Sequence, residues 1–412
     1  MRIYQLAFVA LVALSGCKNK TPPTAPPESG QSPADTPDDE TAGDESGGED
    51  AEDVSPDGEP DKGLEVDTLD QNGRKHSGDD EGEERDATPL VIDFLNAGQG
   101  DCIHIACPNG NSIVVDCGSK GSADPELDEI LAALVLPAPE VRVVLTHQDA
   151  DHYNRLADAL ADADRDKKIK AVYVGGPRTW LPKKGDPSSK KESEKLAAWL
   201  DSHDTTYPTQ PFNGDDLMCG DEVKIDVLLA GYDATPGKPL KSGQNVRKNN
   251  ASIVLKVERD GFGVLLAGDA YEAAENEILD SGKNVEAEVL KLGHHGAPDS
   301  TKPAWLAKVE PDHVITTAGH NNSYGHPNCA VLKRLPKLEG TDNKHSVECS
   351  TGKSKPWKTR EFTESYWNSC EAGHLRLTVE DGGKKATLEA HTFPEDKVSN
   401  SSGKVCPARY QK

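Results

Sequence analysis

The segment Thr146–Tyr153, THQDADHY, places two histidines and two aspartates within six residues, directly after VRVVL, an apolar run typical of a buried strand. A loop at the end of a strand exposes its side chains while the sheet holds them in place. Imidazole nitrogens and carboxylate oxygens gathered in this way are ligands for divalent ions. The segment therefore predicts metal ligands at His147, Asp149, Asp151 and His152. The alternative is a polar loop in which Asp149 or Asp151 caps a helix that starts near Tyr153.

Three later segments also end predicted strands in residues that can bind metal. They are FGVLLAGDAYEAAE with Asp269, VLKLGHHGAPDST with His294 and His295, and ITTAGHNNSYGHP with His320 and His326. A lone histidine is most often structural, and Asp269 alone is equally well explained as a helix cap. Five histidines, however, fall just beyond predicted strands or in the loops that these strands enter: His147, His152, His294, His295 and His326. This recurrence predicts an active-site rim at one end of a sandwich.

The region 89–412 supplies elements that can position such a rim. Short apolar runs such as LVIDFL, ASIVLKV and HLRLTV predict strands, and segments with helical spacing such as DPELDEILAALVL lie between several of them. Hairpins come first and helices later, which predicts an α+β fold of two mixed sheets covered by helices. Residues 338–368 break this rhythm and are predicted to be a polar insertion. No internal linker divides the region, so one domain is expected.

Residues 1–17 have the pattern of a signal peptide. One basic residue precedes an apolar run of about a dozen residues, too short for a bilayer, which takes about 20. The end of the run, LSGC, resembles the lipobox of bacterial lipoproteins and predicts lipidation of Cys17. The alternative is an ordinary signal peptide that contains a cysteine. We expect an exported lipoprotein of the cell envelope, facing the periplasm or the cell surface, whose lipid anchor makes the membrane a partner.

Residues 18–88 are predicted to be a disordered tether. They carry 23 acidic and 6 basic residues, a net charge of −17 out of the chain's −25, and are rich in Pro, Gly and Ser. Such a segment cannot bury enough apolar surface to offset the entropy of ordering. The remaining domain is mildly acidic, which tells against tight binding to a nucleic-acid backbone. Local basic pairs such as Lys183-Lys184 and Arg247-Lys248 are well explained as solvated surface.

Eight cysteines remain after Cys17, an even number that indicates disulfides in an exported protein. In CIHIACPNGNSIVVDC, Asn109-Gly110 predicts a two-residue hairpin turn, which places Cys102 opposite Cys117 and within disulfide reach. Two buried free thiols are the alternative. A second disulfide is expected between Cys349 and Cys370, because both lie in a polar C-terminal stretch.

Five segments, in this order, resemble the metallo-β-lactamase superfamily, and within it the hydrolase domain of ComEC-type competence (DNA-uptake) proteins. They are LNAGQGDCIHIACPNGNSIVVDCG, LTHQDADHYNRL, NNASIVLKV…VLLAGDA, LKLGHHGAPDST and GHNNSYGHP. The resemblance covers roughly residues 90–336 and, weakly, 373–390. It implies a four-layered αβ/βα sandwich with metals at one edge.

The resemblance also implies roles for single residues. The implied metal ligands are His147, Asp149, Asp151, His152 and Asp269, with Asp269 bridging two ions. Asp116, in VVDCG, is implied to brace the loop. His326 is the favoured late ligand, while His294 or His295 would donate a proton to a leaving group; the sequence leaves the choice among these three open.

Two departures from the superfamily pattern affect the metal. The commonest motif has His where Asp149 stands. The mid-chain histidine ligand is missing, and NNASIVL lies in its region, with Asn249 expected as a supporting residue. The site is therefore richer in oxygen ligands than a typical dizinc site, which shifts the expected pair of divalent ions toward Mn²⁺ or Mg²⁺ without excluding Zn²⁺.

The expected function is that of an envelope-anchored metal-dependent hydrolase, a phosphodiesterase or nuclease in which two divalent ions activate water. The expected catalytic residues are Asp151, Asp269, His294 and His295, and a nucleic acid or nucleotide is the expected substrate. One alternative is a hydrolase of a lactone, a β-lactam or a small nucleotide. Another is a non-catalytic envelope lipoprotein with a vestigial site. No protein partner follows from the sequence.

Overall fold

The structure is a computed structural model that describes residues 88–121, 123–182, 190–207, 212–231, 245–320, 322–335, 345–353, 355–362, 365–380, 382–383 and 385–394. The predicted signal peptide, Cys17 and all of the predicted tether except Thr88 lie outside these residues. Among the described helices, none is both long enough and apolar enough to cross a membrane.

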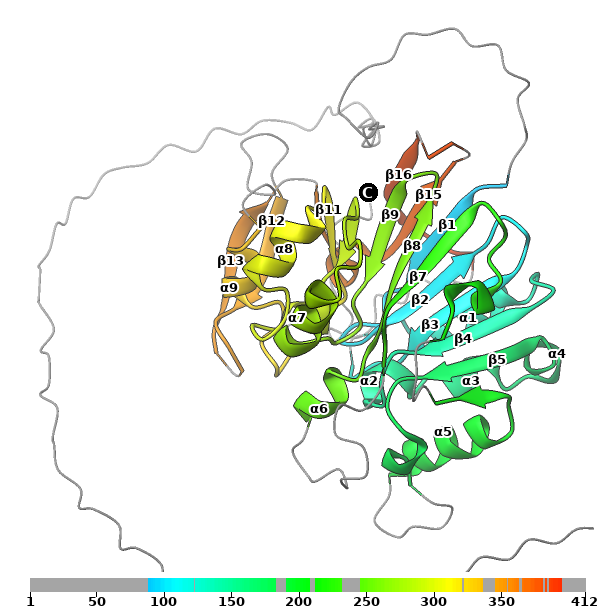
Figure 1. Cartoon of the computed structure of the whole chain (residues 1–412). Helices are drawn as coiled ribbons and strands as arrows, with labels where there is room; N and C mark the ends of the chain where they lie inside the picture. The colour runs from blue at the N-terminus through cyan, green and yellow to red at the C-terminus, as the bar shows by residue number, and fades with distance from the viewer. Residues whose placement is uncertain are drawn as a thin grey trace, which may run out of the picture. The chain divides into compact units, whose positions relative to one another are not determined.

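Two mixed sheets lie face to face at the centre of the fold, as predicted (Figure 1). The larger has the order β16-β15-β1-β2-β3-β4-β5-β6, and the smaller has the order β14-β11-β10-β9-β8-β7. The strands of the larger sheet are β1 (Leu90–Phe94), β2 (Cys102–Ala106), β3 (Ser112–Cys117), β4 (Val141–Leu145), β5 (Ile169–Val174), β6 (Thr205–Thr206), β15 (His374–Val379) and β16 (Ala386–His391). Those of the smaller sheet are β7 (Val223–Ala230), β8 (Ile253–Arg259), β9 (Phe262–Leu266), β10 (Val289–Lys291), β11 (His313–Thr316) and β14 (Tyr366–Asn368).

Helices cover the outer faces of both sheets, which gives four layers (Figure 1). Strand residues alternate between the layers: in β4, Val144 faces the cluster between the sheets, while Val143 and Leu145 face the helices. The larger sheet is covered by α1 (Leu127–Val135), α3 (Leu156–Leu160) and α5 (Lys191–Asp201), and the smaller by α7 (Glu272–Asp280), α8 (Pro303–Val309) and α9 (Cys329–Leu332). The other α-helices are α2 (Ala150–Tyr153), α4 (Ala163–Asp166), α6 (Asn245–Asn249) and α10 (Ser369–Ala372).

The hairpin of β2 and β3 does not have the predicted two-residue turn. The amide of Cys107 donates to the carbonyl of Asn111 at 2.9 Å, so the loop holds three residues. Gly110 is its last residue and has φ 86°, a left-handed conformation that glycine adopts without steric cost. The register is therefore one residue off the prediction, and Ile103 lies opposite Val115.

A β-bulge then restores the predicted cysteine pairing. It lies between Cys102 and Ile103, where β3 contains the extra residue Asp116 with φ 58°. Beyond it, Cys102 faces Cys117, and a disulfide joins them. Bulges redirect side chains near functional sites, and this one directs Asp116 to the strand ends described below.

Between described residues, two further disulfides connect elements. One joins Cys107 in the hairpin loop to Cys219, just before β7, and so links the two sheets. The other joins Cys329 to Cys349, so the predicted pairing of Cys349 with Cys370 is wrong. The reason is local: α9 begins at Cys329 and contacts β12 (His345–Ser350), which ends next to it.

The predicted polar insertion, 338–368, contains ordered elements. Strand β12 pairs with β13 (Trp357–Phe362) as an antiparallel hairpin that forms its own two-stranded sheet. Strand β14 leaves that hairpin and pairs in parallel with β11, so the end of the segment belongs to the sandwich. Residues 336–344 lie outside the described residues.

Candidate metal centre

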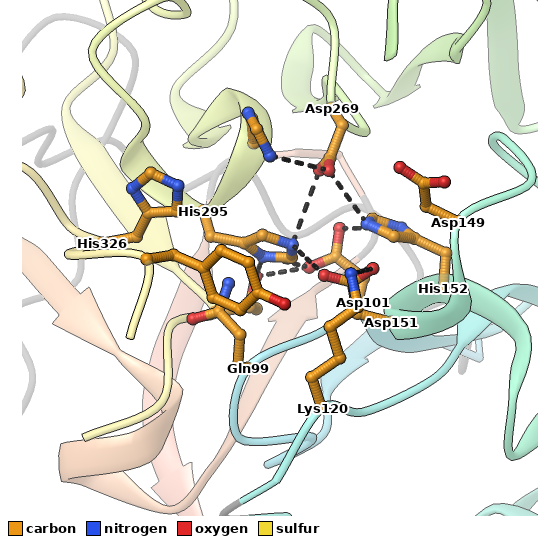
Figure 2. Close-up of polar contacts among 12 residues, drawn as sticks. Gln99, Asp101, Lys120, Asp149, Asp151, His152, Asp269, His295 and His326 are labelled. Carbon is orange, nitrogen blue, oxygen red and sulfur yellow. Dashed lines mark hydrogen bonds and ion pairs between the residues drawn. The ribbon is translucent and has the colours of Figure 1, made fainter. Parts of the chain in front are cut away.

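The predicted site residues lie at one edge of the sandwich, where several strands end. His147 and α2 follow β4, Asp269 follows β9, and His294 and His295 follow β10. His326 lies in the loop after β11. Figure 2 shows the residues from these loops converging around Asp269.

Three fully buried histidines direct Nε2 toward the Asp269 carboxylate. The distances to its oxygens are 3.2 Å from His152, 3.6 Å from His147 and 3.6 Å from His295. All four residues are buried, and neither the three nitrogens nor Asp269 Oδ1 has a hydrogen-bond partner within the described part of the chain. Buried polar atoms almost always have partners. The donor set of imidazole nitrogens and carboxylate oxygens therefore fits a divalent ion.

A buried aspartate fixes the ring of His152 from the other side. Asp116 Oδ2 lies 2.7 Å from His152 Nδ1, and the same carboxylate accepts from the amide and the hydroxyl of Thr146, both at 2.7 Å. A partner on Nδ1 sets the tautomer and the orientation in which Nε2 is free to bind metal. The bulge at Asp116 thus supports the site through His152.

His295 has an equivalent arrangement, built on a residue that sequence reasoning missed. Its Nδ1 lies 3.4 Å from Asp101 Oδ1 and 3.2 Å from Thr317 Oγ1. Asp101 also forms an ion pair with Lys291 and accepts from Thr317, and both Asp101 and Lys291 are buried. The available signal was Lys291 itself, a charged residue within the apolar strand VLKL.

Asp151 and Asp149 lie on the wall of the cluster. Asp151 Oδ2 is 3.8 Å from His295 Nε2, and its Oδ1 pairs with Lys120 at 2.7 Å. Asp149 Oδ2 is 3.9 Å from His147 Nε2, and its Oδ1 pairs with Lys248 at 2.8 Å.

The helix-cap alternatives fail for both loops. Asp149 occupies the N-cap position of α2, but its side chain makes no capping hydrogen bond. Tyr271, and not Asp269, is the N-cap residue of α7.

The late histidines differ in position. His295 is fully buried and joins groups of side chains that can share one ion, and His326 joins none of these groups among the described residues. His294 Nε2 lies 3.6 Å from Asp269, with its side chain 21% exposed. The His326 ring centre is 5.2 Å from that of His294. His320 pairs with Glu348 and lies outside the cluster. The geometry therefore favours His295 as the late ligand and leaves His294 and His326 on the pocket wall.

Burial and charge set the protonation states around Asp269. Burial lowers the pKa of His147 to about 3, and neighbouring His152 adds to the effect. Burial also acts to lower the pKa of His152, but Asp269 and Asp116 outweigh it and raise that pKa well above its ordinary value. In turn, His152 and His294 overcome the effect of burial on Asp269 and hold its pKa well below the usual range. The carboxylate is thus ionised, as a ligand must be.

Strained backbone brings these side chains together. Asp116, His294 and His295 have φ between 47° and 58°, a left-handed conformation that residues with a Cβ seldom adopt. Such residues concentrate at functional sites. Gly118 allows a close approach: a Cβ there would lie 2.5 Å from the amide of His152.

The cluster opens into a pocket of about 100 Å³. Its lining residues are Gln99, Lys120, Asp149, Asp151, Asn249, Asp269, Tyr271, His294, Tyr324 and His326. Asn249, expected as a supporting residue, is buried, and its Oδ1 has no hydrogen-bond partner among the described residues. This amide therefore adds that unpartnered oxygen to the lining of the pocket.

Comparison with known proteins agrees with this architecture. Residues 95–320 match the family model described as the metallo-beta-lactamase superfamily. The chain is 27% identical to ComE operon protein 3 of Bacillus subtilis over 261 residues, which are 60% of this chain and 30% of that protein. It is 31% identical to Competence protein ComA of Neisseria gonorrhoeae over 131 residues, 30% of this chain and 19% of that protein.

The chain thus spans less than a third of the length of these relatives. The residues that match the family model include the cluster of His147, His152, Asp269 and His295.

Proposed function

The chain belongs to the metallo-beta-lactamase superfamily and is a metal-dependent hydrolase, and from this premise we propose that it cleaves phosphodiester bonds in a nucleic acid or nucleotide. We further propose that the cluster holds two divalent ions, Mn²⁺, Mg²⁺ or Zn²⁺, and that Asp269 is one of the residues that would hold them. Two ions in one site lower the pKa of a shared water and balance charge on the attacking and leaving oxygens.

The proposal rests on one observation, a small pocket beside Asp269 that has Lys120 on its wall. A volume of about 100 Å³ is well below the roughly 300–1,000 Å³ of pockets that enclose a small organic ligand. The pocket is therefore large enough for a reacting group such as a phosphodiester. Lys120 lines the pocket and pairs with Asp151 at 2.7 Å, and its ammonium group can also contact an anionic group such as a phosphodiester.

Residues of the chain position the ligands and transfer a proton. Asp269, ionised and buried, holds the centre, while Asp116 and Asp101 keep the rings of His152 and His295 in place. His294 is less buried than His295 and His326, and its Nε2 would exchange a proton with a leaving oxygen. The sequence left His294 and His295 as alternative proton donors. We assign this role to His294 and the role of late metal ligand to His295.

The names of two relatives add support for the substrate class. ComA of Neisseria gonorrhoeae is named a competence protein, and Recombination protein 2 of Haemophilus influenzae is 37% identical over 91 residues, 22% of this chain and 11% of that protein. We also propose that Cys17 anchors the chain in the cell envelope, with the membrane as partner. The support for this anchor is the sequence of the first 17 residues.

Hydrolysis assays with the full chain test the proposal. The substrates are bis-p-nitrophenyl phosphate, single- and double-stranded DNA, a chromogenic β-lactam and an aryl lactone. Each is assayed with Mn²⁺, Mg²⁺, Zn²⁺ or a chelator. We expect turnover of the phosphodiesters that requires metal and is lost in Asp269→Asn.

Asp164→Asn is the matched control. Asp164 is exposed on α4, away from the strand ends that form the site, so the same chemical change should leave activity intact. Turnover of the lactam or lactone alone would contradict the phosphodiesterase assignment.

A further inference from the structure

An exposed aromatic ring lies at the mouth of the pocket. Tyr324 lines the pocket, and 37% of its surface is exposed. Its ring is nearly parallel to that of His326, with an interplanar angle of 16°, and Lys120 Nζ lies 5.4 Å from the centre of the tyrosine ring. The Tyr324 ring thus contacts two other residues of the pocket, His326 and Lys120.

The hairpin of β12 and β13 supports the loop that carries this ring. Gly325 lies so close to the hairpin that a Cβ would be 2.5 Å from the carbonyl oxygen of Gly352. The amide of Ser350 donates to the carbonyl of Pro327 at 3.1 Å, and the Cys329–Cys349 disulfide lies next to this bond. The pocket loop and the hairpin turn therefore form one continuous surface.

The turn of this hairpin carries two lysines, Lys353 and Lys355. Lys353 and Lys355 are exposed and have no ion-pair partner among the described residues. The amide of Lys355 donates to the carbonyl of Gly352 at 3.0 Å, and its carbonyl accepts from Ser350 Oγ at 3.1 Å. In a chain of net charge −25, these two lysines lie beside Gly325, which follows Tyr324 at the pocket.

We propose that Tyr324, Lys353 and Lys355 form a binding surface for single-stranded nucleic acid, with a base stacked on the tyrosine and phosphates held by the two lysines. This inference rests on the proposed phosphodiesterase function and specifies its substrate as a strand. Nucleotides that flank a phosphodiester in the pocket lie on this surface. Aromatic side chains beside basic residues bind single strands without sequence preference, because unpaired bases expose their faces.

Fluorescence anisotropy with a labelled 20-nucleotide single strand and the full chain, in chelator to prevent cleavage, tests the surface. Lys353→Glu/Lys355→Glu should weaken binding at least tenfold. It should also flatten the dependence of log K on log salt by about 1.4, because each phosphate contact with a single strand contributes about 0.7. Tyr324→Ala should weaken binding by roughly tenfold, and Tyr324→Phe should retain it, because the stacking ring is kept.

Lys167→Glu/Lys170→Glu is the matched control. Both lysines are exposed and lie at α4 and β5, across the molecule from the hairpin (Figure 1). This variant changes the net charge equally and should bind the strand like the unmodified chain.

Turnover of bis-p-nitrophenyl phosphate separates this inference from the proposed function. The hairpin variant should retain that turnover, since the small ester does not reach the turn. Failure of the unmodified chain to hydrolyse the ester would refute the phosphodiesterase, while binding would still report on the surface. Equal strand binding by the hairpin variant and the unmodified chain would overturn the surface, as would hairpin-dependent binding to anionic lipid vesicles without binding to the strand.

Discussion

Two buried aspartates support two histidines in the same way. Asp116 binds Nδ1 of His152, and Asp101 binds Nδ1 of His295, which leaves both Nε2 atoms directed at Asp269. Outer partners of this kind hold the ring in one tautomer and increase its basicity toward metal. The affinity of the site therefore depends on residues that do not touch the ion.

The first prediction concerns Asp116. Asp116→Asn should lower metal affinity by roughly 10- to 100-fold, as is typical when an outer partner of a ligand is removed. Titration against a chromophoric chelator measures the change. Asp164→Asn is the control at an exposed position, and equal affinities in all three proteins would contradict the role assigned to Asp116.

A second prediction concerns the Asp101–Lys291 ion pair, in which both side chains are buried. Lys291→Met leaves a charged aspartate without its partner, which costs about 3–5 kcal/mol when the pair is buried. Adding Asp101→Asn removes the charge and should recover part of the loss. Urea unfolding of the single and double variants measures both steps, and strictly additive losses would refute the coupling.

The sequence indicates some of these residues and not others, for a physical reason. Asp116 and His152 each lie in a recognisable local motif at a strand end. Asp101 gains its role from Lys291 and Thr317, which are 190 and 216 residues away along the chain. Such a partnership has no local signature. The choice between His295 and His326 likewise required the fold, because both follow strands.

At the scale of elements, α7 and α8 are joined by one buried carboxylate. Glu275 on α7 accepts hydrogen bonds from the amides of Thr301 and Lys302, directly before α8 begins at Pro303. These bonds hold the segment that leads from the histidine pair into α8. Burial nevertheless raises the pKa of Glu275 to about 7.

This shift predicts how stability changes with pH. The folded state binds the Glu275 proton more tightly than the unfolded state, so the contribution of Glu275 to stability is complete below pH 4.5 and is lost as the pH rises to about 7. The change amounts to roughly 3 kcal/mol. Glu275→Gln should remove this part of the pH dependence, as measured by urea unfolding between pH 4.5 and 8. An unchanged profile would show that another group is responsible.

The periodicity of the sequence predicts the main strands and long helices, because their apolar residues repeat with the period of each element. It predicts neither the bulge at Asp116 nor the left-handed histidines, since these depend on contacts between loops. The β12–β13 hairpin was also missed as structure. Strand β13 is largely polar, and a disulfide joins β12 to α9.

For the whole molecule, the two sheets are linked covalently. The Cys107–Cys219 disulfide joins the β2–β3 hairpin to the start of β7 across a sequence separation of 112 residues. Closing so long a loop restricts the unfolded chain more than closing a short one. The family resemblance predicts the sandwich as a whole, but no local pattern indicates this link.

Removing one long-loop and one short-loop disulfide in turn tests whether the longer loop stabilises the fold more. Cys107→Ala/Cys219→Ala should lose about 2–5 kcal/mol of unfolding free energy. Cys329→Ala/Cys349→Ala, which opens a separation of 20 residues, should lose less. Urea unfolding under oxidising conditions measures both, and a larger loss from the shorter loop would contradict the argument.

The central claim is that the cluster around Asp269 binds two divalent ions, and metal stoichiometry tests it most directly. The full chain would be dialysed to equilibrium against Mn²⁺, Mg²⁺ or Zn²⁺ in turn, and bound metal would be counted by elemental analysis. We predict two equivalents per chain of at least one of these metals, and fewer than one in Asp269→Asn. No bound metal in the unmodified chain, or equal binding by the variant, would contradict the account.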